Sequence, residues 1–457
     1  MRILISKKRF VTWILLGVFW VLGTYAFIFQ LISEELASSV RVPLYLLADI
    51  LILVTGICVM RNRTDIWLCG SFIVISFTLT VFFNNGSLIQ WINGLRDYIG
   101  LLFVIPIFRW LMSDTVSSNY FIPLMDKTLY IFLWIQAPCL LYQYFVYGGW
   151  DYGGGSLGFL FSGVISTLIY LISFYLLTRR WKGDKSFWRN LKSNYVLLLL
   201  LIPSFLNETK ISFIFLLLYF VLIIPFSKQN IKKLLFILPV GIIFISLAAY
   251  IYSSSYGASS DKDVFSLEYL QWYTVGDEDA LAVLEVAYDN MDDEEESDYQ
   301  RGLKFLAFSW IVQSDPQILF TGKGLGQFKG GSVLTQTPFA KQYDWFLSGT
   351  TMTLLNLLIE LGLPGLIWFI VFCICSFRPY IKLGKNRAKS VSSYLFMILL
   401  ITILYNTSLN IQVFYLIFMY MLFLSSRWEK TRIADSVRSV CDTKCLETFA
   451  DENSDCK

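Results

Sequence analysis

Histidine is absent from this chain of 457 residues. Histidine is the side chain that most readily titrates near neutral pH, and it is also the commonest metal ligand in proteins. Any acid–base chemistry here must therefore use another side chain, and a histidine-ligated metal site is excluded. Charged residues are also scarce, because Asp, Glu, Lys and Arg make up 16% of the chain, against about 25% in typical soluble domains.

Cysteine is present but indicates no metal site or disulfide framework. None of the eight cysteines lies between residues 253 and 351, the longest polar stretch of the chain. Cys441, Cys445 and Cys456 lie in a polar tail and lack the fourth ligand of a structural zinc site. The acidic run 292–296 lacks the turn glycine and the spacing of a calcium loop. We therefore expect neither a metal ion nor another cofactor.

Long apolar runs dominate the sequence. Hydrophobic residues make up 56% of it, and runs of about 20 apolar residues recur from end to end, as in membrane helices. The first run is too long for a signal peptide, and no small-residue cleavage site follows it. We predict an all-α polytopic membrane bundle of about 12 transmembrane helices, with one large, partly helical extracytoplasmic loop. The predicted spans are residues 10–32, 42–60, 66–83, 88–110, 129–146, 157–177, 195–206, 211–226, 234–252, 352–375, 391–405 and 411–424.

The basic residues predict the orientation in the cell membrane. Lys and Arg cluster before the first span and after the second, sixth, eighth and tenth spans, so all basic loops fall on one side. By the positive-inside rule that side is cytoplasmic, and both termini lie there. The predicted regions are a bundle of nine spans (1–252), an extracytoplasmic loop with 16 acidic and 6 basic residues (253–351), three further spans (352–425) and a cytoplasmic tail (426–457).

The seventh and eighth spans are short and are separated by the sequence NETK. Because the loops on either side of the pair are both basic, we interpret the pair as a tight hairpin whose tip faces outward. The alternative is one long kinked helix, which would place the two basic loops on opposite sides. Glu208 and Lys210 lie at the tip, where they either bind substrate or simply extend to the membrane surface.

Ionisable residues inside membrane spans are costly and mark candidate functional sites. Arg96 and Asp97 lie roughly 12 Å below the outer end of the fourth span, at 1.5 Å per residue. They form either a structural ion pair or part of an outward-facing cavity in which Arg96 meets an anion. Glu360 lies at similar depth in the tenth span, with Asn356 one turn earlier. It either binds substrate, pairs with Arg96 or makes a polar contact between helices.

The outer loop contains a predicted amphipathic helix and a glycine-rich turn. The helix, SDYQRGLKFLAFSWIVQSDP, ends before Pro316 and carries Arg301 and Lys304 on one face, with Leu303, Leu306 and Trp310 on another. The turn GKGLG contains Gly322, Gly324 and Gly326, with Lys323 between the first two. Glycines let backbone N–H groups approach a phosphate. The alternative is that the same sequence forms a plain loop without a ligand.

Together these segments resemble the superfamily of Wzy-type polysaccharide polymerases and O-antigen ligases. The similar stretches are SDYQRGLKF, DPQILFTGKGLGQF and TTMTLLNLLIELGLPGL, with NETKIS and GLRDYIGLLFVIP earlier in the chain. In that superfamily an arginine-bearing outer helix precedes a glycine-rich turn that ends in an aromatic residue. A membrane helix with an E-x-G-x-x-G ending follows, here Glu360, Gly362 and Gly365. The plan of about a dozen spans with one long outer loop is also similar.

The resemblance implies glycosyl transfer at the outer face of the membrane. A sugar hydroxyl of one oligosaccharide repeat unit attacks the anomeric carbon of another, and polyprenyl pyrophosphate leaves. Arginine suits a pyrophosphate because its fork makes paired hydrogen bonds. The residues implied for catalysis are Arg301, Arg96, Lys210 and Glu208, and those implied for substrate binding are Lys304, Lys323, Gly322, Gly324, Gly326 and Glu360.

Two departures from the superfamily matter. Ligase members place a histidine near the position of Thr351, whereas this chain has none, which favours the polymerase branch. Lys210 stands where arginine is usual. The identity of the general base is left open. Glu208 or Glu360 could serve if burial raised the pKa of its carboxyl group, or the reaction needs no strong base.

The leading hypothesis is therefore a polymerase of lipid-linked oligosaccharide repeat units in the cell membrane. Its expected partners are the polyprenyl-pyrophosphate-linked substrate, the lipid bilayer, a flippase and a chain-length regulator, and no nucleic acid. The alternatives are a transporter or flippase of lipid-linked glycans, a ligase-type transferase, and an envelope assembly or signalling protein without chemistry. We find no clear repeat between the two halves of the chain, which transporters usually show.

Overall fold

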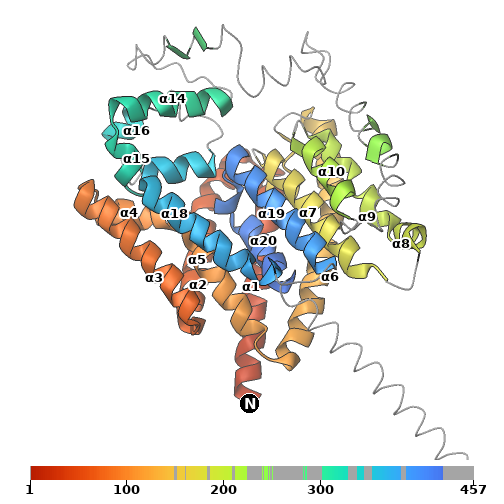
Figure 1. The fold of residues 1–457 in the computed structure, drawn as a ribbon. Coiled ribbons are helices and arrows are strands. Elements are labelled where there is room, and N and C mark those ends of the chain that lie inside the picture. Colours follow the sequence, from red (N-terminus) through yellow and green to blue (C-terminus); the bar gives the residue numbers. More distant parts are fainter. Residues whose placement is uncertain are drawn as a thin grey trace, which may run out of the picture.

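The computed structural model describes residues 2–148, 152–159, 161–182, 186–207, 211–223, 301–327, 337–343, 352–381 and 387–425, with a few residues between 239 and 285. All regular structure in these residues is helical (Figure 1). Seven helices of this part are long and apolar enough to cross a membrane. They match predicted spans one to six and ten, so the all-α membrane architecture is confirmed in this respect.

The seven long helices are continuous or interrupted only briefly. Three of the seven contain a break: the third changes to a π-helical turn, the fourth contains a 3-10 turn, and the seventh is kinked at Gly362 (φ 60°, ψ −154°). Their bounds are α1 (Arg2–Gln30), α2 (Glu34–Val59), α3 (Arg63–Phe77) with η1 (Thr78–Phe83), α4 (Leu88–Leu95) with η2 (Arg96–Tyr98) and α5 (Ile99–Leu111), α6 (Thr115–Tyr147), α7 (Ser162–Arg180) and α18 (Thr353–Ile381).

The remaining predicted spans form apolar segments of 10–17 residues, Lys389–Tyr405 within α19 among them, or lie outside the described part. The short apolar helices are α9 (Tyr195–Leu199) with η5 (Ile202–Leu206), α10 (Ile211–Leu222), α19 (Arg387–Tyr405) and α20 (Gln412–Ser425). A straight crossing takes about 20 residues. Most of the predicted span 234–252 lies outside the described residues. A total of twelve crossings is therefore a prediction that the structure does not confirm.

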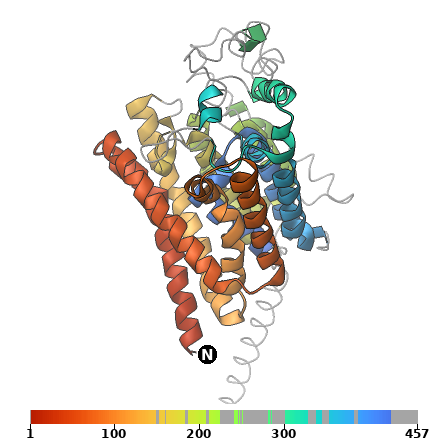
Figure 2. The ribbon, with the colours of Figure 1, turned by 90° about the vertical axis from the view of Figure 1, so that its left-hand side faces the viewer.

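The core of the bundle is built around α7 and α20. Every residue of α20 is buried, and α7 is buried along nearly its whole length. Helices that are apolar on all sides belong in the interior. α7 packs against α6, α10, α19 and α20, and α20 also packs against α5. Of the seven long helices, α2 and α3 are the least buried, and they lie at the periphery of the bundle (Figure 2).

The segments of the predicted seventh and eighth spans form a hairpin. The Ser173 hydroxyl on α7 donates to the Leu197 carbonyl (2.9 Å) and lies 3.1 Å from the Tyr219 hydroxyl. Nearer the start of α7, the Asn207 amide donates to the Ser166 hydroxyl (3.0 Å). The chain therefore passes Ser173 twice and turns beside the first half of α7. The two segments therefore lie side by side as in the hairpin interpretation and not as one long kinked helix, whereas the outward direction of the tip stays a prediction.

Ion pairs join the helix ends on the side where α1 begins. Arg109 lies 3.1 Å from Asp65, and Arg179 lies 3.5 Å from Asp126. Lys8, near the start of α1, pairs with Asp114 in the α5–α6 connection. We call this side the basic end. It gathers the loops predicted to be cytoplasmic, although the membrane orientation itself remains a prediction.

The described part of the large loop packs over the first half of α18, at the opposite side of the bundle, which we call the loop end (Figures 1 and 2). It contains α14 (Arg301–Ser314), α15 (Gln317–Thr321) and α16 (Pro338–Gln342). α14 ends before Pro316, as predicted. Leu303, Phe308 and Ile311 join a small apolar cluster with Leu355 and Ile359 of α18.

The predicted faces of α14 are partly wrong. Lys304 was placed on the polar face, yet it is only 2% exposed and follows Leu303 on the buried face. Leu306 and Trp310, predicted on the apolar face, are partly buried and pack against the apolar cluster that contains Leu303, in agreement with that prediction. Packing against α15 and α18 determines which side of a short helix is covered, and its own sequence pattern is weak.

Candidate functional site at the loop end

Arg96 lies in the 3-10 turn η2 and is held by a buried carboxylate. Its Nε donates to Asp49 Oδ2 of α2 at 3.0 Å, and its terminal Nη1 donates to Asn93 Oδ1 at 3.4 Å. Asp49 is 2% exposed, whereas the Arg96 side chain is 26% exposed. The carboxylate therefore fixes the Nε edge of a guanidinium that is partly exposed.

The second oxygen of Asp49 ties this pair to α20. Gln412 Nε2 donates to Asp49 Oδ1 at 2.8 Å. Buried polar atoms normally have hydrogen-bond partners. Gln412 Oε1 and the Tyr415 hydroxyl are buried without one among the described residues. Gly100 permits this approach, because a Cβ there would lie 2.3 Å from the Tyr415 ring. Arg96 and Asp49 thus belong to a polar centre between α2, α20 and the segment formed by η2 and α5.

The GKGLG turn lies against α18 and the end of the third span. Its consecutive backbone N–H groups all donate to protein acceptors. The donor–acceptor pairs are Gly322 N to Ile318 O (2.9 Å), Lys323 N to Ile359 O (2.8 Å), Gly324 N to Glu360 O (2.8 Å), Leu325 N to Thr80 Oγ1 (2.8 Å) and Gly326 N to Glu360 Oε1 (2.8 Å). The N–H groups that would bind a phosphate are therefore already hydrogen-bonded within the protein. Through these bonds the turn holds the loop against α18 and the end of the third span, like a clasp.

Glycine is required in this clasp for conformation and space. Gly322, Gly324 and Gly326 have φ of 64°, 89° and 79°, where a side chain is strained. A Cβ at Gly326 would lie 2.4 Å from the Gln90 carbonyl oxygen, and one at Gly94 would lie 2.4 Å from the Gly326 nitrogen. We call Gly322–Gly326, with Gly94 and Gly362 facing them, the glycine clasp. It joins the loop to α4 and α18.

Glu360 links the clasp to the neighbourhood of Arg96. Its side chain is 4% exposed, Oε1 accepts from the Gly326 N–H, and Oε2 lies 3.5 Å from the Tyr98 hydroxyl, which donates to it. Tyr98 is two residues from Arg96 in the same 3-10 turn. Of the roles considered from the sequence, the polar contact between segments is the one that the structure contains.

The other predicted site residues are not brought to Arg96 by any described contact. Lys323 Nζ pairs with Asp315 Oδ2 at 2.6 Å and lies 5.7 Å from the Phe339 ring centroid. Lys304 is buried under α14. α14 begins at Arg301, whose side chain lies outside the described part. Glu208 and Lys210, at the hairpin tip, also lie outside it.

Asp49 is the main residue that sequence reasoning missed. It lies in the predicted second span, in YLLADILILV, so the rule that singled out Arg96 applies to it equally. Gln412 and Tyr98 carried no comparable signal, because uncharged polar and tyrosine side chains are common in membrane helices. Neither a known family model nor a curated protein matches the chain.

Proposed function

We propose that this protein is a polymerase that joins polyprenyl-pyrophosphate-linked oligosaccharide repeat units at the outer face of the cytoplasmic membrane, in surface polysaccharide synthesis. One observation supports this most. The segments GLRDYIGLLFVIP, TGKGLGQF and NLLIELGLPGL, which carry much of the resemblance, meet at one end of the bundle through Gly94, Tyr98, Gly326 and Glu360. Similar motifs scattered over unrelated places would argue against a shared site.

The proposed reaction needs a cation for its leaving group. A bond forms between a hydroxyl oxygen of one repeat unit and the anomeric carbon of the other. The bond from that carbon to the pyrophosphate oxygen breaks, the electron pair stays on the pyrophosphate, and the hydroxyl proton leaves to a base or to water. Arg96 is the described side chain best suited to the growing negative charge, because Asp49 orients it through Nε while the guanidinium stays partly exposed and has more N–H donors than these two contacts use.

Asp49 acts in this proposal as a positioning residue. A carboxylate that accepts from both Arg96 and Gln412 keeps the guanidinium in one orientation before substrate binds. Preorganised charge lowers the barrier more than a freely rotating side chain does. Arg301 and Lys210 remain the further pyrophosphate-facing cations that the resemblance implies, and Glu208 remains a candidate base.

A second candidate is a transporter of lipid-linked glycans. The observation that favours it is the set of interrupted spans at η1, η2 and Gly362, since transporters often build sites from broken helices. In this reading Arg96 would bind the pyrophosphate during passage rather than during bond formation.

Deletion of the gene separates the two candidates. We expect long surface polymer to disappear while single repeat units accumulate on the carrier at the outer face, because joining is blocked after transport. The measurement is a gel of surface and lipid-linked glycans, combined with labelling of sugars in intact cells by a reagent that does not enter. Accumulation of the units on the cytoplasmic side would support the transporter, and unchanged polymer would contradict both candidates.

A further inference from the structure

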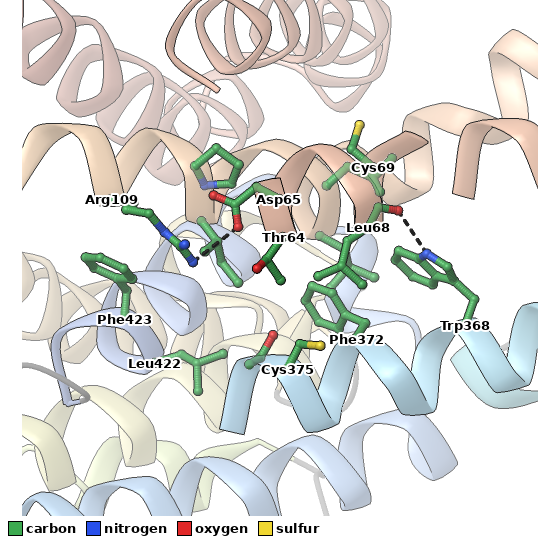
Figure 3. A pocket seen from close by; sticks show the side chains of 15 residues that line it. Thr64, Asp65, Leu68, Cys69, Arg109, Trp368, Phe372, Cys375, Leu422 and Phe423 are labelled. Atoms are coloured by element: carbon green, nitrogen blue, oxygen red, sulfur yellow. Dashed lines mark hydrogen bonds and ion pairs between the residues drawn. The ribbon is translucent and has the colours of Figure 1, made fainter. Parts of the chain in front are cut away.

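A separate pocket lies at the basic end, between α3, α5, α18 and α20 (Figure 3). It is a cavity of about 90 Å³. Small side chains create it, because Thr64, Cys69, Cys375 and Ser376 stand where larger ones would close the gap between the helices. None of the residues proposed for glycosyl transfer lines this pocket.

The pocket is charged at one end and apolar along its length. Arg109 and Asp65 lie together at one end, and Trp368 lies at the other, with Leu68 and Phe372 between them (Figure 3). From Cys375 to Trp368 the helix rises roughly 10 Å, at 1.5 Å per residue. The Trp368 indole N–H donates to the Leu68 carbonyl at 3.0 Å, so this end has no free donor on the ring. The pocket therefore suits a ligand with an apolar hydrocarbon chain and a polar head group.

Arg109 has hydrogen-bonding capacity left over. Its Nη2 lies 3.1 Å from Asp65 Oδ1, and its guanidinium carbon lies 6.0 Å from the Phe423 ring centroid. Its Nε is buried and has no acceptor among the described residues. The charged end of the pocket therefore presents a partly exposed guanidinium that already holds one carboxylate.

The surface beside the pocket is apolar. On α18, Ile367, Ile370 and Ile374 are 59%, 48% and 57% exposed, and on α3, Ile66 and Trp67 are 50% and 58% exposed. In a membrane helix bundle such faces contact lipid tails. An occupant of the slot would therefore arrive from the bilayer.

We propose that this pocket binds an anionic phospholipid of the leaflet at the basic end, with a few carbons of one acyl chain in the slot and the phosphate on Arg109. Basic pockets between helices on the cytoplasmic side are suited to anionic head groups. A phosphate oxygen accepts from the exposed part of the guanidinium, whose side chain is 33% exposed, while Nη2 retains Asp65. The bound lipid fixes the distance between α3 and α18, the two helices whose other ends hold the glycine clasp.

The test measures thermal unfolding of the purified full-length protein in a mild detergent. Dioleoyl phosphatidylglycerol is titrated in, with dioleoyl phosphatidylcholine and sodium phosphate as parallel probes. A ligand that binds the folded state raises the unfolding midpoint. We expect phosphatidylglycerol alone to raise it in a saturable way, because both the chain and the negative charge are needed.

Two variants with matched controls locate the effect. Arg109→Gln with Asp65→Asn removes the cation without leaving a buried carboxylate unpaired, and Cys375→Trp fills the slot. Each should raise the half-saturating phosphatidylglycerol concentration about tenfold or more. The first variant loses a charge-assisted hydrogen bond to the phosphate, and the second loses the space for the acyl carbons. The controls Arg63→Gln and Ile374→Trp, which change exposed neighbours, should respond as the wild type does.

The proposal is overturned if phosphatidylglycerol does not stabilise the wild type, or if phosphatidylcholine or sodium phosphate stabilises it equally well. An unchanged response in the Cys375→Trp protein would equally contradict it, and that variant keeps all charges in place. Because polymer synthesis is not part of the readout, these outcomes are independent of the proposed glycosyl transfer.

Discussion

In a strain that lacks the gene, a copy carrying Arg96→Ala is expected to restore less than about 1% of the long polymer that the wild-type copy restores. The physical reason is that the guanidinium is proposed to stabilise the leaving pyrophosphate, and the loss of one preorganised donor at a developing negative charge commonly costs about 100-fold or more in rate. The measurement is a glycan gel with densitometry, normalised to the amount of protein in the membrane fraction.

Stability must be separated from chemistry in this experiment. Arg96→Ala leaves Asp49 buried without its cation, which costs up to about 3–5 kcal/mol of folding stability. Arg96→Lys keeps the positive charge beside Asp49 but removes the planar fork, and we expect it to fold normally and to make little polymer. Arg63→Ala, at the exposed basic end, is the matched control and should behave as wild type. Full-length polymer from Arg96→Lys and Arg96→Ala proteins would contradict the role given to Arg96.

Asp49→Asn should lower polymer synthesis less than Arg96→Ala does. The asparagine keeps an acceptor for Gln412 but loses the charge that orients Arg96 Nε. A positioning role predicts that adding Arg96→Lys to Asp49→Asn costs little more than Arg96→Lys alone, since both changes disturb one interaction.

The second large effect is expected at the glycine clasp. Gly326→Ala should destabilise the protein by about 2–5 kcal/mol, of which about 1–2 kcal/mol comes from the left-handed φ and about 1–3 kcal/mol from the contact with the Gln90 carbonyl. We expect a lower midpoint of thermal unfolding in detergent and loss of long polymer, because the loop would separate from α4 and α18.

Gly148→Ala is the control that isolates the steric part. Gly148 has φ of 85°, and a Cβ there would meet no atom within 4 Å, so only the cost of the backbone conformation, about 1–2 kcal/mol, applies. Glu360→Gln retains Oε1 as an acceptor for the Gly326 N–H, so it should be milder than Glu360→Ala if the clasp is its role. If Glu360→Gln alone removed all polymer at normal stability, Glu360 would instead be a catalytic group.

The helices could be predicted because a membrane span is recognised from the length and apolarity of one continuous stretch of sequence. Length and apolarity identified the spans that became α1 to α7 and α18, and Pro316 marked the end of α14. The hairpin was predictable because charge on both sides of residues 195–226 restricted the number of crossings. Each of these signals is contained within one short stretch of chain.

Pairings between distant segments could not be predicted in the same way. Nothing in the sequence around Asp49 specifies Arg96 as its partner, and the use of the GKGLG N–H groups depends on acceptors from Thr80, Ile359 and Glu360. Without knowledge of those acceptors, the sequence GKGLG is equally compatible with a phosphate-binding turn. Lys304 became buried because α14 packs against other elements, which its own pattern does not encode.

The central claim is that this protein itself forms the glycosidic bond, and reconstitution tests it most directly. Purified protein in liposomes would be supplied with lipid-linked repeat units extracted from the deletion strain, and the products would be separated by size. The account predicts a ladder of lipid-linked oligomers with release of polyprenyl pyrophosphate, and no ladder with Arg96→Ala or Arg96→Lys protein. If folded wild-type protein leaves the repeat units single, or merely moves them across the bilayer, the polymerase proposal is wrong.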